Sequence, residues 1–123
     1  MPSTCATFHG SRFYWLGQVA PRFAEPLSSL YSKPSEDEWV SSRDLPKIQS
    51  ALKQSSAQLR SAMETMLVDP KPVGPYSHPL FFMQHMLWHE GWHVAEVIQA
   101  LRVGGSELSE EWEQENIWGV WRA

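Results

Sequence analysis

The stretch from Leu80 to Arg102 reads LFFMQHMLWHEGWHVAEVIQALR and decides the fold of this chain. It is apolar around much of a helical circumference, which indicates a central, largely buried helix. Pro79 suits the first turn of such a helix, and the pair Gly104-Gly105 is typical of its end. The sequence therefore predicts one helix from Pro79 to about Val103, capped by one of the two residues before the proline.

Two more helices are expected upstream of this one. The first covers about Thr7 to Leu30, where apolar residues recur at three- and four-residue steps. Pro21 should kink or stop it, because proline removes a helical hydrogen bond and clashes with the preceding turn. The second helix is expected to begin after Asp44, a suitable N-cap residue, and to end near Val68.

The remaining segments contain no run with convincing strand alternation. The polar stretch from Ser32 to Ser42 is typical of a loop. The tail after Glu107 carries three of the seven tryptophans, which suggests that it packs onto the body of the protein. We therefore expect an all-α protein with three main helices, forming a single domain over residues 1–123.

Composition excludes several classes of function. The formal net charge of −4 and the absence of a Lys/Arg cluster argue against nucleic acid as a partner. No stretch is apolar long enough to cross a membrane, and the N-terminus lacks the pattern of a signal peptide. Cys5 is the only cysteine, so no internal disulfide is possible. These features predict a cytoplasmic, soluble protein.

The expected C-terminal helix carries histidines at His85, His89 and His93. Two imidazoles four residues apart lie on one helix face, and both can reach one ion at roughly 2.0–2.1 Å. The outer two diverge by about 80°, so only one adjacent pair can bind a given ion, with a further ligand from another segment. Histidines on helices are also commonly solvated or hydrogen-bonded in a core, and spacing alone does not separate these interpretations.

The segment from His89 to His93 also matches the H-E-x-x-H motif of zinc peptidases. In those enzymes the two histidines bind the metal and the glutamate, here Glu90, is the general base. The longer metzincin extension is absent, and no strands are expected that could bind an extended peptide. A metal-dependent hydrolase of this type remains an alternative.

The run from His85 to Gly105, with its H-x-x-x-H followed by Leu101-Arg102, resembles the last core helix of the DinB/YfiT-like proteins. These are helical bundles that hold a divalent metal, nickel or zinc, with three histidines. The segment Phe8 to Leu16 resembles the earlier helix that supplies the third histidine, and the tail from 115 to 122 is similar to tails in part of the family. The resemblance implies His9, His89 and His93 as ligands, with an open coordination position.

The resemblance also implies a function, with two departures from the family pattern. It implies a metal-dependent transferase or hydrolase acting on a small-molecule substrate, with a low-molecular-weight thiol as a candidate co-substrate. Glu96 stands where the family often has glutamine, and the family's usual first helix is lacking. The bundle would then be completed by the tail or by a second subunit, and we expect a homodimer. A non-catalytic helical interaction protein is the remaining alternative.

Overall fold

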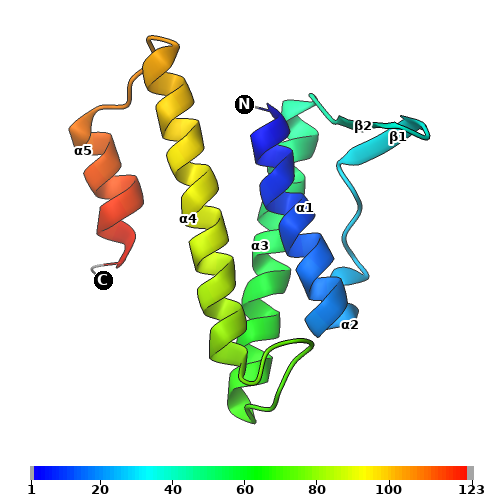
Figure 1. Cartoon of the computed structure of the whole chain (residues 1–123). Coiled ribbons are helices and arrows are strands. Elements are labelled where there is room, and N and C mark those ends of the chain that lie inside the picture. The colour runs from blue at the N-terminus through cyan, green and yellow to red at the C-terminus, as the bar shows by residue number, and fades with distance from the viewer. Residues whose placement is uncertain (1, 122–123) are drawn as a thin grey trace. The chain divides into compact units, whose positions relative to one another are not determined.

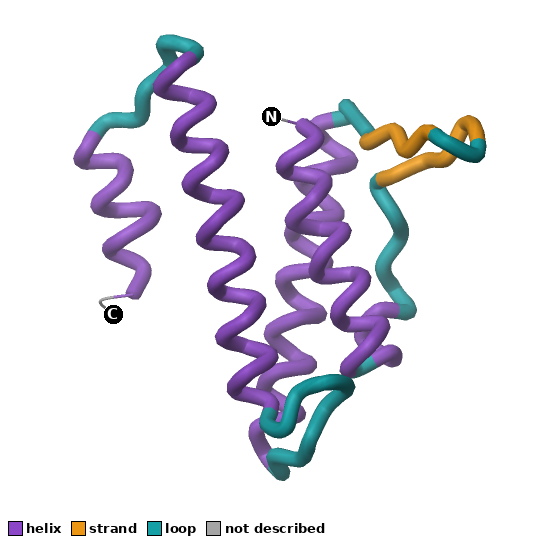
Figure 2. Tube along the Cα trace, viewed as in Figure 1, coloured by secondary structure: helices purple, strands orange, loops and turns teal. Residues whose placement is uncertain are grey.

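The computed structural model of the chain describes residues 2–121, with side chains from Thr4 to Val120. Figures 1 and 2 show the order of its elements. This order is α1 (Pro2–Val19), α2 (Pro21–Ala24), β1 (Tyr31–Ser35), β2 (Glu38–Ser41), α3 (Leu45–Val68), α4 (Pro79–Val103) and α5 (Glu110–Glu113), followed by a π-helical turn (Gln114–Trp118) and a 3-10 turn (Gly119–Trp121). The described chain is mostly helical, as expected.

The chain forms two compact units, one up to Glu90 and one from Gly91 onward. The long helix α4 contributes its first half to the first unit and its second half to the second. None of the helices in residues 2–121 has both the length and the apolarity needed to cross a membrane.

Local signals explain where the long helices begin and end. The Asp44 carboxylate accepts a hydrogen bond from the Lys47 backbone N–H at 3.1 Å, and α3 follows as predicted. The His78 ring accepts one from the Leu80 backbone N–H at 3.1 Å, which makes it the cap of α4. At the other end of α4, Gly105 has a φ of +74°, a conformation that glycine adopts at little cost.

The N-terminal region corrects one expectation and confirms another. Helix α1 stops at Val19, and the short α2 begins anew at Pro21, so the proline interrupts the helix as predicted. The expected continuation to Leu30 is wrong, because α2 ends at Ala24 and the chain then becomes extended.

The stretch predicted to be a loop contains a small antiparallel hairpin instead. Tyr31 pairs with Ser41 and Ser32 with Val40, and the register becomes irregular before Ser35. The strands are short and mostly exposed, so no alternation of buried and polar side chains marks them in the sequence. Residues 2–121 are therefore mostly helical with one two-stranded sheet, rather than purely α-helical.

In the first unit, α1 and α3 lie side by side and run in the same direction (Figure 1). The segment that connects the end of α1 to the start of α3 contains α2 and the hairpin. Two buried clusters fill the space between these elements: Leu16, Ala24, Leu27 and Ala62 in one, and Ala6, Leu30 and Ile48 in the other. From α4, Phe82 is fully buried and Met86 is 2% exposed. Burying such side chains is the main source of stability for the unit.

Candidate functional site

His93 forms a close pair with a carboxylate in the second unit. Its Nδ1 lies 2.6 Å from Oε2 of Glu96, three residues later on α4, and Oε1 of Glu96 accepts a hydrogen bond from the Trp92 indole at 3.1 Å. The contact with His93 is the main reason why the pKa of Glu96 lies below its usual value. In the neutral imidazole, this arrangement makes Nδ1 the donor and places the lone pair on Nε2.

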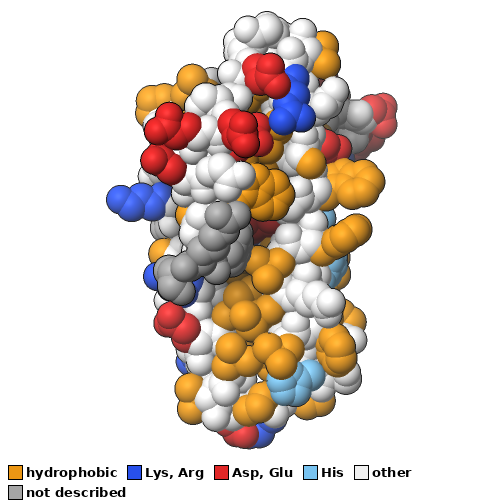
Figure 3. All heavy atoms as spheres, turned by 90° about the vertical axis from the view of Figure 1, so that its left-hand side faces the viewer, with side chains coloured by type: hydrophobic (Ala, Val, Ile, Leu, Met, Phe, Trp, Pro, Cys, Tyr) orange, Lys and Arg blue, Asp and Glu red, His pale blue; other side chains and the backbone are white. Residues whose placement is uncertain are grey.

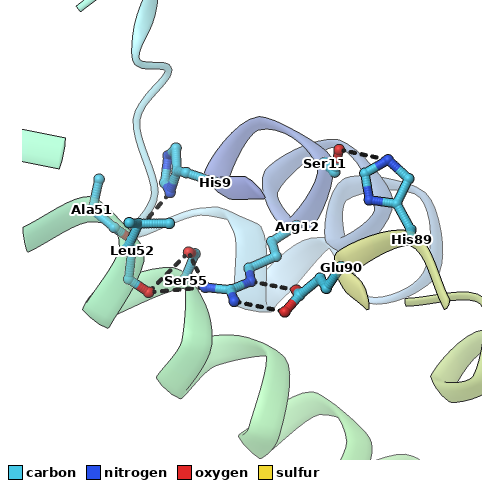
Figure 4. A network of polar contacts seen from close by, with 8 residues as sticks. All are labelled: His9, Ser11, Arg12, Ala51, Leu52, Ser55, His89 and Glu90. Atoms are coloured by element: carbon cyan, nitrogen blue, oxygen red, sulfur yellow. Dashed lines mark hydrogen bonds and ion pairs between the residues drawn. The ribbon is translucent and has the colours of Figure 1, made fainter. Parts of the chain in front are cut away.

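His89 precedes His93 by one helical turn in the same uninterrupted helix, α4. Within the first unit, its Nε2 lies 3.4 Å from the hydroxyl oxygen of Ser11, on α1 (Figure 4). Its ring also meets that of His85 edge-on, with centroids 6.4 Å apart. His89 and His93 keep in α4 the four-residue spacing on which the predicted metal-binding pair depends.

His9, the third predicted ligand, is fully buried in the first unit and faces the backbone. Its Nδ1 lies 3.1 Å from the carbonyl oxygen of Ala51, and its Nε2 lies 2.7 Å from that of Ser28. In Figure 4 the ring points toward α3, while His89 lies on the other side of the view beside Ser11. His9 would have to leave a carbonyl oxygen before either nitrogen could bind a metal, so these contacts favour a structural role.

Glu90, the predicted general base, is held by Arg12 of α1. Arg12 Nε donates to Oε1 at 2.6 Å, and Nη2 donates to Oε2 at 2.8 Å, so both carboxylate oxygens are engaged (Figure 4). The remaining guanidinium nitrogen donates to the backbone carbonyl of Leu52 at 3.1 Å. A carboxylate paired in this way is poorly suited to accept a proton from a substrate or water.

His85 packs into an aromatic cluster of the first unit. Its Nδ1 lies 2.6 Å from the hydroxyl of Tyr76, and its ring meets that of Trp15 edge-on with centroids 5.1 Å apart. Burial raises the pKa of the Tyr76 phenol, which keeps the hydroxyl in the form that can donate to His85. These contacts give His85 a packing role in the first unit.

Within residues 2–121, no group of three or more His, Cys, Asp or Glu side chains is arranged to hold a metal ion. His89 and His93 share α4, whereas His9 is turned to the backbone of other segments. The contacts of two polar residues near the predicted ligands, Glu96 and Arg12, were not predicted. Glu96 had a local signal, three residues after His93, but Arg12 had none, because its partner is 78 residues away.

Comparisons with models of protein families, with curated proteins and with solved structures find no match to this chain. Any function of the chain therefore has to be inferred from the chemistry of its own residues.

Proposed function

We propose that the chain binds one divalent metal ion through His89 and His93, and that it is a metal-dependent protein of the DinB-like kind. The observation that carries the proposal is the contact between His93 Nδ1 and Glu96 Oε2 at 2.6 Å. Metal-binding histidines commonly donate their second ring nitrogen to a carboxylate, which fixes the tautomer and makes the ligand more basic. His89 is proposed as the second ligand because it precedes His93 by four residues in the same helix.

The ligand set differs from the one that the family resemblance implies. We propose that His9 fastens α1 to its neighbours, because both of its nitrogens contact backbone carbonyl oxygens. The ion would then take its other ligands from water or substrate. A bound divalent ion would act as a Lewis acid and lower the pKa of a thiol or of water. This chemistry suits the transferase or hydrolase reactions that the resemblance implies, on a small molecule with a thiol co-substrate, in the cytoplasm.

The alternative of an H-E-x-x-H hydrolase has less support. It needs Glu90 to act as a base, but both oxygens of Glu90 accept hydrogen bonds from Arg12. The sheet is limited to two short strands in the described residues, which offers little edge for an extended peptide.

Calorimetric titration of the protein, purified without a histidine tag, tests the metal proposal directly. We expect one equivalent of Ni²⁺ or Zn²⁺ to bind, with Ni²⁺ binding more tightly than Co²⁺ or Mn²⁺, as nitrogen ligands prefer. His89→Ala and His93→Ala should each weaken Ni²⁺ binding at least tenfold. His78→Ser, which keeps a capping side chain before α4, is the matched control. Unchanged Ni²⁺ binding in both alanine variants would refute the proposal.

A second candidate function is self-association, favoured by the outward face of α4 in the first unit. Leu80 and Leu87, like Phe81 and Trp88, are seven residues apart and therefore share a face. All four are more than half exposed, whereas Phe82 and Met86 on the inward side are buried. Figure 3 shows hydrophobic side chains gathered on the lower part of one side of the molecule. We propose that a second copy covers this face, because two-fold pairing lets one patch serve both subunits.

A further inference from the structure

A cavity of about 530 Å³ lies between α1 and the hairpin in the first unit. Four aromatic side chains line it: Phe13 and Tyr14 from α1, Tyr31 from β1 and Trp39 from β2. Its volume falls within the range of small-molecule sites. The cavity contains none of the predicted metal ligands, so it is separate from the proposed metal site.

We propose that this cavity binds a neutral, planar aromatic small molecule. Trp39 is 67% exposed and Tyr14 is 60% exposed, so both rings already offer an open surface to a ligand. Aromatic rings gain from stacked and edge-to-face contacts beyond the area that they bury. The amide of Gln18 is one of the few polar groups in the lining, and it can accept or donate one orienting hydrogen bond.

The residues that line the cavity, together with Lys33, favour a neutral ligand over a cation. No residue that lines the cavity is charged at neutral pH. The ammonium group of Lys33 lies 5.8 Å from the centroid of the Trp39 ring, where it interacts with the π-system. A cationic ligand would compete with Lys33 for this ring and be repelled by its charge. The lining itself offers no carboxylate that could pair with a cation, so its aromatic rings favour an uncharged ring.

Gly10 on α1 keeps part of this space open. A Cβ atom there would lie 3.3 Å from Cε2 of Tyr31, so any larger side chain must displace that ring or fill the cavity. At Gly17, on the same helix, a Cβ atom would meet nothing within 4 Å. The two glycines provide a matched pair of substitutions in one helix, one that blocks the cavity and one that leaves it unchanged.

Titration of the full chain with indole, followed by nuclear magnetic resonance of the tryptophan side-chain N–H groups, tests the proposal. We expect saturable binding with a Kd of roughly millimolar or tighter, as suits a ligand of this size. The Trp39 signal, assigned by its loss in Trp39→Ala, should shift most. Trp39→Ala should weaken binding about fivefold, which is the loss of one aromatic stacking contact. Trp118→Ala, at a tryptophan that is 53% exposed and lies outside the proposed self-association face, should leave binding unchanged.

Gly10→Leu should also weaken indole binding at least fivefold, whereas Gly17→Leu should not, with folding of each variant checked by circular dichroism. Equal weakening by Trp39→Ala and Trp118→Ala would reveal general adhesion to exposed tryptophans and overturn the proposal. Tighter binding of benzyltrimethylammonium than of indole would show a cation site instead. If indole does not bind the parent protein and Trp39→Ala lowers the mass of the oligomer, a second copy of the chain occupies the cavity and the proposal is overturned. His89→Ala should bind indole normally, which separates this test from that of the metal proposal.

Discussion

Arg12 and Glu90 face one another through two parallel contacts, Nε to Oε1 at 2.6 Å and Nη2 to Oε2 at 2.8 Å. The Arg12 side chain is 13% exposed and that of Glu90 is 24% exposed, so water screens this pair less than a surface ion pair. Arg12 also donates to the backbone carbonyl of Leu52. One guanidinium therefore links α1, α3 and the first half of α4, which gives the acidic residue of the H-E-x-x-H motif a structural role.

Replacing Arg12 should destabilise the protein more than replacing its partner. We expect Arg12→Met to lower the free energy of unfolding by about 2–3 kcal/mol, because it leaves a partly buried carboxylate unpaired. Glu90→Gln should cost less, since the amide oxygen still accepts one hydrogen bond. Urea denaturation measures both, with the exposed Arg60→Met as the control, expected within about 0.5 kcal/mol of the parent. Equal stability of Arg12→Met and Arg60→Met would contradict the linking role.

Glu96 should tune the proposed metal site through His93. We expect Glu96→Ala to weaken Ni²⁺ binding about tenfold, as loss of a carboxylate behind a metal-binding histidine generally does. Glu96→Gln should lose less, because its amide oxygen still accepts from Nδ1. Calorimetric titration measures the affinities, and Glu64→Ala on the exposed side of α3 is the control. If Glu96→Ala and Glu64→Ala bind Ni²⁺ alike, the contact between Glu96 and His93 has no part in metal binding.

His9 should matter for folding more than for metal binding. Removing its ring leaves a cavity and deprives a buried carbonyl oxygen of its hydrogen-bond donor, so His9→Ala should cost about 2–4 kcal/mol of unfolding free energy. Ni²⁺ affinity, measured where circular dichroism shows the variant folded, should stay within twofold of the parent. The opposite outcome, lost Ni²⁺ binding with unchanged stability, would restore His9 as the third ligand.

Tyr76 should make the free energy of unfolding fall at alkaline pH. Burial raises the pKa of this phenol above its ordinary value of 10.0, so the folded state keeps a proton that the unfolded state loses. The corresponding stability is fully present below pH 10 and is lost as the pH rises through the folded-state pKa. Tyr76→Phe should therefore lose less stability above pH 10 than the parent, as followed by urea denaturation. Tyr14→Phe, at a tyrosine 60% exposed, should lose stability with pH as the parent does.

The outward face of α4 should control self-association. We expect light scattering to give a dimer for the parent at micromolar concentration and a monomer for the double variant Phe81→Ser/Trp88→Ser, because polar side chains remove the apolar patch. Trp112→Ser, at a tryptophan 45% exposed on α5, should remain a dimer. A monomeric parent protein would show that no second copy is needed to cover this face.

The long helices could be predicted from the sequence because their signals are local. Asp44 caps α3 through a backbone N–H three residues away, and Pro21 stops α1 because it has no N–H to donate. The spacing of His89 and His93 is likewise a property of one helix. The hairpin was missed because its strands are short and exposed, so no periodic burial marks them.

By itself, the sequence determined the two long helices α3 and α4, the break at Pro21 and the spacing of His89 and His93, since each depends on residues within a few positions of one another. Only the tertiary structure decided what His9 and Glu90 contact. His9 meets a carbonyl oxygen 42 residues away, and Glu90 meets a guanidinium 78 residues away. Such partners are chosen by how the helices pack, because a buried polar group must satisfy its hydrogen bonds with whatever the fold brings beside it.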